Sequence, residues 1–273
     1  MANDRPYAHA PLVLSLIEFR HPVTRALSRD ELEPLKRGLA DAVPIMRAEE
    51  VMNFAINIGP AGPQPQPSAA TVFRLESRDQ KTRVVIRPEA MAFETVSYPG
   101  WTEFRALVER ALTLRQEISP IDGIERIGLR YIDEIRPRED AGRSTNWKQW
   151  VKESMLAPTF TPTGDALVVQ QQQCAVQYML PTPDQTLTLR YGAVDGPSAI
   201  QPNDPRALGG AAVSSSPHFL IDTDAAWTLP LGGTMPEFEV NALLNLADEL
   251  HEPSRAIFEA AITDYARGEF NRD

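Results

Sequence analysis

The sequence contains a single cysteine, Cys174, in 273 residues. One cysteine cannot form an internal disulfide framework or a zinc site built from several thiolates, so both are excluded. Cys174 is also a poor candidate nucleophile, because it follows a run of glutamines and no adjacent basic residue would stabilise a thiolate. Residues 1–11 lack the apolar segment of a secretory signal. We therefore expect a cytoplasmic protein of bacterial type.

Positive charge is scarce as well. The chain has 27 Lys and Arg against 37 Asp and Glu, which gives a formal net charge of −10. General affinity for a phosphate backbone requires clustered positive charge, so nucleic acid is not an expected partner, although a local basic patch stays open. No apolar run approaches the roughly 20 residues that a membrane helix needs, so we expect no membrane partner.

Recognisable catalytic motifs are missing. The spacings Gly-x-Ser-x-Gly and Gly-x-x-x-x-Gly-Lys are absent, which removes the usual support for a hydrolase or a nucleoside triphosphatase. The four histidines (His9, His21, His218 and His251) include no pair spaced for metal binding on a helix. We assign no catalytic residue, no metal and no cofactor, and whether the protein is an enzyme stays open, with a preference for a non-enzymatic role.

Hydrophobic periodicity predicts alternating groups of strands and helices. The predicted strands are 12–20, 51–58, 71–77, 82–87, 91–98, 124–135, 167–180, 185–193 and 218–226. The predicted helices are 29–42, 101–119, 146–156 and 237–268, the last one bent or broken at Pro253. Segments 59–67 and 192–217 are rich in proline or glycine and indicate loops.

The order of these elements suggests two similar halves, 1–120 and 121–273. Each half shows a strand, a helix, a three-stranded meander and a helix, although sequence identity between the halves is negligible. We predict an α+β fold in which both halves form one broad antiparallel sheet with helices packed on one side. Because the join near 120–123 is short and apolar, we expect residues 1–273 to form a single unit rather than two separable domains. An internal duplication and an ordinary α+β meander both stay open as origins of this order.

Several short segments carry a resemblance to a known family. They are the opening APLV with IEFR at 10–13 and 17–20, GLRYID at 128–133, and FLIDTD at 219–224. Because these segments occur in this order, the chain resembles the sporadically distributed bacterial family of uncharacterised proteins of about this length. The distribution of that family resembles that of genes carried with bacterial defence or toxin–antitoxin sets. The resemblance therefore implies a role beside such systems, and it implies no mechanism.

Charged residues in otherwise apolar strands are the first candidate site residues. Glu18 and Arg20 lie two residues apart on one predicted strand, and Asp133 lies on another, with Arg130 on the opposite face of that second strand. Such groups must lie at a strand end, form pairs, or serve a function. We expect an ion pair between the halves, with Glu18 and Arg130 as the example, and a ligand-facing arrangement is the alternative.

Asp222 and Asp224 are the second candidates. Alternate strand residues point to the same face, so these two carboxylates could approach a divalent cation. Aspartates at strand ends also form local turns, and no third acidic residue nearby completes a metal site. We assign both as weak partner-binding or ligand-binding residues and predict no metal. His251, with Glu249 and Glu252 nearby, is expected on the surface of the last helix.

Two functional hypotheses follow from different classes. In the first, the protein is a non-enzymatic interaction module that binds a protein partner through a sheet face and the 192–217 loop, within a defence or toxin–antitoxin set. In the second, it is a receptor or enzyme for a small ligand, with a pocket between sheet and helices. A deep pocket would favour the second hypothesis and a flat apolar face the first. The sequence leaves open whether copies of the chain associate.

Overall fold

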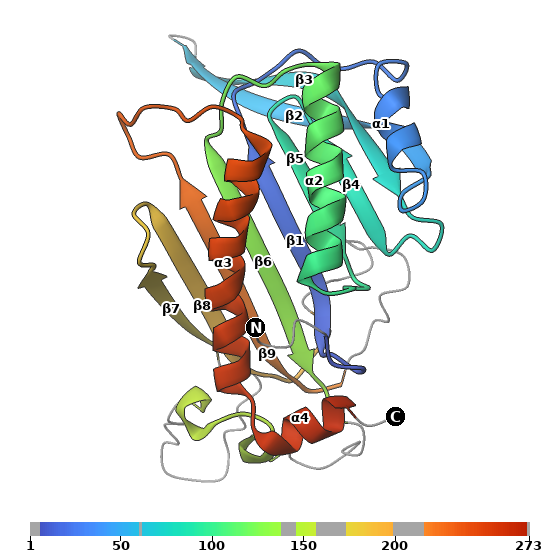
Figure 1. The fold of residues 1–273 in the computed structure, drawn as a ribbon. Coiled ribbons are helices and arrows are strands. Elements are labelled where there is room, and N and C mark those ends of the chain that lie inside the picture. The colour runs from blue at the N-terminus through green and yellow to red at the C-terminus, as the bar shows by residue number, and fades with distance from the viewer. Residues whose placement is uncertain (1–5, 60–61, 138–145, 157–172, 199–215, 272–273) are drawn as a thin grey trace.

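The computed structural model describes residues 6–59, 62–137, 146–156, 173–198 and 216–271. Within these ranges it describes the side chains of all residues except 51–70. In these ranges the protein is an α+β fold with one nine-stranded antiparallel sheet (Figure 1). The strand order is β2-β3-β4-β5-β1-β6-β9-β8-β7, so β1 lies in the middle. The predicted broad antiparallel sheet is therefore confirmed.

The strands follow the predicted positions closely in most of the chain. Their bounds are β1 (Leu12–Arg20), β2 (Ile45–Gly59), β3 (Gly62–Glu76), β4 (Thr82–Ile86), β5 (Ala90–Thr95), β6 (Arg126–Ile135), β7 (Cys174–Met179), β8 (Gln185–Val194) and β9 (His218–Thr228). The part of the predicted strand 167–180 before residue 173 and most of the predicted loop 192–217 lie outside the described residues.

Three helices cover one face of the sheet. Figure 1 shows α1 (Glu33–Gly38), α2 (Trp101–Ile118) and α3 (Val240–Ala261) on the same side, with α2 and α3 running side by side. α4 (Asp264–Asn271) lies at one end of the sheet. Among the described helices, none lies over the opposite face. Within the described residues, no helix has the length and apolar content that crossing a bilayer requires.

The main core lies between the sheet and these helices. Strand residues alternate between the two faces, so Ile17 and Phe19 of β1 are buried against the helices while Leu16 and Glu18 point away from them. Phe104 and Val108 of α2 and Leu250 of α3 fill the same core at helical spacing. A smaller cluster on the opposite face contains Leu14, Ile132 and Leu220. We call the face of the sheet that packs against the helices the helix face, and the opposite face the far face.

The predicted loop at 59–67 is wrong. Apart from residues 60–61, which are not described, this segment belongs to a long hairpin in which β3 pairs with β2 from Gly62 onwards. Prolines 63, 65 and 67 alternate, so their nitrogens, which have no hydrogen to donate, face the same side of the strand. β4 pairs with β3 only at Phe73–Glu76, so it requires no donor from these prolines. Proline content was therefore a misleading loop signal here.

Three predicted helices also differ from the structure. The helix expected at 29–42 is reduced to α1, because Pro34 has no amide hydrogen to donate to the carbonyl of the preceding turn. Ser28 and Glu31 form a reciprocal cap ahead of it. The helix expected at 146–156 is two short 3₁₀ turns, η1 (Trp147–Gln149) and η2 (Glu153–Met155), separated where Val151 pairs with Ile262.

The last predicted helix is interrupted at a different place from the one expected. Pro253 lies inside a continuous α3. The helix ends before Ile262, whose backbone pairs with that of Val151. Thr263 then caps the following helix, because its hydroxyl accepts a hydrogen bond from the amide of Ala266 at 3.2 Å. Strand-like pairing therefore ends the helix here, whereas the helix accommodates its proline.

Candidate functional site

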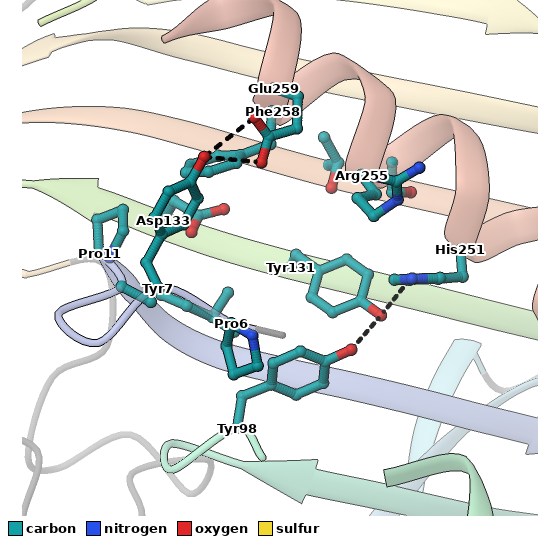
Figure 2. A pocket seen from close by; sticks show the side chains of 14 residues that line it. Pro6, Tyr7, Pro11, Tyr98, Tyr131, Asp133, His251, Arg255, Phe258 and Glu259 are labelled. Carbon is teal, nitrogen blue, oxygen red and sulfur yellow. Dashed lines mark hydrogen bonds between the residues drawn. The ribbon is translucent and has the colours of Figure 1, made fainter. Parts of the chain in front are cut away.

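A cavity lies on the helix face, between β6, β9 and the second half of α3, and the segment before β1 forms one wall (Figure 2). Its volume is about 120 Å³. Ring side chains and other apolar groups make up most of its lining. The lining residues are Pro6, Tyr7, Ala10, Pro11, Leu12, Tyr98, Tyr131, Asp133, Thr223, His251, Ser254, Arg255, Phe258 and Glu259.

The wall before β1 is attached to the C-terminal helices. The Tyr7 hydroxyl donates to both carboxylate oxygens of Glu259, at 3.0 and 3.1 Å, and Arg267 of α4 binds the same carboxylate. The amide of His9 donates to the carbonyl of Phe270 at 2.8 Å. Burial, and next the bond to the Glu259 carboxylate, raise the pKa of Tyr7, so its phenol stays neutral and acts as a donor.

A row of polar side chains forms the opposite wall. The hydroxyls of Tyr98 and Tyr131 are 3.4 Å apart, and the Tyr131 hydroxyl lies 2.9 Å from Nδ1 of His251 (Figure 2). The His251 ring stacks on Trp101 with a centroid separation of 4.6 Å, and the Trp101 indole donates to Asp248 at 2.7 Å. His251 is buried, so the expectation of a surface histidine was wrong. This row holds the two tyrosine hydroxyls and the imidazole in fixed positions.

Asp133 is the unusual group of the cavity. Its residue exposure is 7%, and its side chain forms no hydrogen bond or ion pair with another described residue. Burial raises the pKa of its carboxyl to about 8, and the nearby charge of Asp222 contributes to the same shift. The side chain lines the cavity among the tyrosine rings (Figure 2). At neutral pH Asp133 is therefore mostly an uncharged acid next to a cavity.

The other five candidate residues lie on the far face, away from this cavity. Arg130 of β6 donates to both carboxylate oxygens of Asp222 on β9, at 2.8 Å each, and Arg190 of β8 lies 3.5 Å from the same group. Arg20 is paired with Glu18 at 3.2 Å. Asp224 is paired with Arg126 at 3.7 Å. These side chains thus form ion pairs across the central strands.

The expected ion pair between the halves forms, but Glu18 pairs with Arg126 at 3.7 Å, so the example of Glu18 with Arg130 was wrong. Residue 18 is opposite Gly128 on β6, and Arg130 is opposite Leu16, so the register separates the two charged groups. The carboxylate of Glu18 instead forms ion pairs with Arg20, Arg87 and Arg126. A Cβ atom at Gly128 would lie 2.3 Å from a guanidinium nitrogen of Arg126, so glycine leaves the space in which Arg126 extends between Glu18 and Asp224.

The far-face carboxylates Asp222 and Asp224 are bound by arginines. Asp222 and Asp224 lie on the same face, as predicted, but their partners are arginines. No group of three or more potential metal ligands occurs within the ranges that the structure describes. The two carboxylates therefore contribute to the stability of the sheet.

Most of the cavity residues were missed at the sequence level. Asp133 was singled out, but Tyr7, Tyr98 and Glu259 were not, and His251 was assigned to the surface. Tyr7 and Glu259 are 252 positions apart in the chain, so no local spacing relates them. The one available signal was the pair of polar residues at 131 and 133, which alternate on one face of an apolar strand.

Comparisons with known proteins add no assignment. No protein-family model matches the chain, and no curated protein sequence matches it significantly. The family resemblance of the short segments described above stays a prediction.

Proposed function

We propose that the protein binds a small organic molecule in the cavity between the sheet and α3. Asp133 is the observation that carries the proposal, because it is a buried carboxyl group that borders a cavity and has no partner among the described residues. Burying a polar group without a hydrogen bond costs free energy, so such a group is typical of a binding site that a ligand completes. This supports the second of the two hypotheses from the sequence.

The cavity has the other features of a small-molecule site. It is concave and largely apolar, and a few polar groups converge on it, namely Tyr98, Tyr131 and His251 in addition to Asp133. Its volume of about 120 Å³ is below the roughly 300–1,000 Å³ of sites for drug-sized ligands. The expected ligand is therefore small.

The test is a ligand-observed NMR screen of small polar molecules against the full chain and two variants. Ser254→Leu places a larger side chain on the cavity wall, whereas Ala256→Leu makes a comparable change at an exposed position of the same helix. We expect bound molecules to be lost from Ser254→Leu and retained by Ala256→Leu. Molecules that bind all three proteins equally, or no bound molecule at all, would contradict the proposal.

A protein partner is a second proposal, favoured by β7. This strand is the last one in the described sheet, and it exposes Val176, Tyr178 and Met179, the last with 89% of its surface. A partner strand adds readily to an exposed edge through main-chain hydrogen bonds. If it does so here, Tyr178→Lys should abolish co-purification of a partner with the tagged protein. Recovery of the same partner by the variant would remove β7 from this role.

We also propose that the two halves arose by duplication. The strand order supports this, because β1, β5, β4 and β3 follow one another outward from the centre on one side, and β6, β9, β8 and β7 do so on the other. α2 and α3 each follow the last strand of their half. The expected cytoplasmic location stays part of the proposal on the sequence grounds given above.

A further inference from the structure

The carboxylates that the sheet buries differ in one respect. Among the side chains that the structure describes, four of the five buried acidic ones have arginine partners: Glu76 and Glu94 bind Arg83, Glu134 binds Arg136, and Asp222 binds Arg130. Asp133 is the fifth, and it has no such partner among the described residues. An ionised carboxylate is costly to bury unless a cation or hydrogen bonds compensate its charge, and without them the carboxyl takes up a proton. Asp133 instead lines the cavity.

The remaining walls of the cavity are suited to a cation as well. Four aromatic rings line it, those of Tyr7, Tyr98, Tyr131 and Phe258. Aromatic rings attract ammonium and guanidinium groups through the negative charge on their faces, and this attraction is strongest in sites with little water. The carboxylate of Glu259 adds a negative group at the same wall, although Tyr7 and Arg267 already bind it.

We infer that the ligand is a small organic ammonium ion, whose cationic group binds the Asp133 carboxylate and whose hydrocarbon part packs against the tyrosine rings. This inference rests on the proposed function and names its ligand class. Arg255 is a positively charged residue in the cavity wall and would repel a cationic ligand. Its repulsion is reduced because its guanidinium binds the Glu252 carboxylate at 2.6 Å. The volume of about 120 Å³ limits the ligand to a few heavy atoms beyond the ammonium group.

Binding should release a proton. The free Asp133 carboxyl is mostly protonated at pH 7, since its pKa is about 8, whereas alkylammonium ions lose their proton only near pH 10. In the complex the carboxylate is ionised beside the ammonium, so the proton of Asp133 passes to the solvent. The charged or titratable groups that face or adjoin the site are Tyr7, Tyr98, Tyr131, Asp222, His251, Arg255, Glu259 and Arg267.

The experiment is isothermal titration calorimetry with three probes of similar shape: isobutylammonium, isobutanol and isovalerate. The full chain should bind isobutylammonium most tightly, and Asp133→Asn should weaken that binding at least tenfold while leaving isobutanol unaffected. Asp224→Asn removes a carboxylate from the far face and serves as the matched control with unchanged binding. Titrations in phosphate and in Tris, which differ in ionisation enthalpy, should show close to one proton released at pH 7.

Three results would overturn the inference. The first is that isobutylammonium does not bind, and the second is that isovalerate or isobutanol binds at least as tightly as isobutylammonium. The third is that Asp133→Asn binds isobutylammonium with the affinity of the unchanged protein. Each of them is distinct from a failure of the proposed function. If other molecules from the screen still bind and Ser254→Leu still excludes them, the cavity is a ligand site for a different chemical class.

Discussion

The two faces of the sheet bury acidic groups in opposite circumstances. On the far face, Asp222 and Glu134 are buried and each is bound by an arginine. On the helix face, Asp133 is buried to a similar extent and has no partner within the described part of the chain. Asp133 and Glu134 are neighbours in sequence, and the alternation of the strand alone separates them. Arginines therefore compensate the charge of the far-face carboxylates, whereas Asp133 borders the cavity without such a partner among the described residues.

The largest expected effect is on the pH dependence of stability. The folded pKa of Asp133 is raised above the unfolded value, so its carboxyl lowers the free energy of unfolding progressively as pH rises from about 4 to about 8. Asp133→Asn removes this loss and should stabilise the protein by on the order of 5 kcal/mol at pH 9, with little effect at pH 4. Urea denaturation at several pH values measures it. If the unchanged protein and Asp133→Asn showed the same pH dependence of stability, the pKa of Asp133 would not be raised in the folded protein.

The corresponding substitution on the far face, Asp222→Asn, should lower the free energy of unfolding. Asp222→Asn removes the negative charge and replaces one of the two oxygens that accept from Arg130 with an amide NH2 group, and hydrogen bonds to charged groups contribute about 1.5–3 kcal/mol. Arg130→Met should cost about 3 kcal/mol, because it leaves Asp222 buried with only the longer contact to Arg190. A double-mutant cycle should give a coupling energy above about 1 kcal/mol. Additive effects would mean that the two charges do not interact.

A smaller effect is expected at Gly128. Gly128→Ala should displace the Arg126 guanidinium from its position between Glu18 and Asp224. Since Arg126 and Asp224 are only partly buried, the loss should be below about 1 kcal/mol and should shrink at high salt. Thermal denaturation at low and high ionic strength tests this. A loss of several kcal/mol would instead indicate that the strand backbone itself is disturbed.

The smallest effect should be at the join between the halves. Ile121 and Ile124 are buried, and the amide of Ile124 donates to the carbonyl of Pro236, so this segment is packed against the second half. Limited proteolysis should therefore leave residues 120–124 intact. Two stable fragments produced by cutting there, each folding alone, would show that the halves are separate domains.

Much of the fold was predictable because its signals are local. β1 and α2 were expected within one residue of their observed bounds, since apolar runs and helical periodicity depend on neighbouring residues. The errors arose where tertiary contacts override a local signal. The prolines of β3 pair with a long partner strand, and Val151 pairs with Ile262 where two helices had been expected.

The candidate site was only partly predictable for the same reason. Alternation on β6 identified Asp133, but register decided the partners of the other charged residues, and register was not inferable from one sequence. The cavity depends on Tyr7 at one end of the chain meeting Glu259 near the other. Such a contact exists only in the folded protein.

The most direct test is a ¹³C NMR titration of the Asp133 carboxyl, assigned by comparison with Asp133→Asn. In the free protein, the account predicts a neutral carboxyl at pH 7 that titrates near pH 8. Addition of isobutylammonium at pH 7 should shift the signal to that of an ionised carboxylate. A carboxyl that titrates near the ordinary value of about 4, or that stays neutral in the presence of the ammonium ion, would contradict the account.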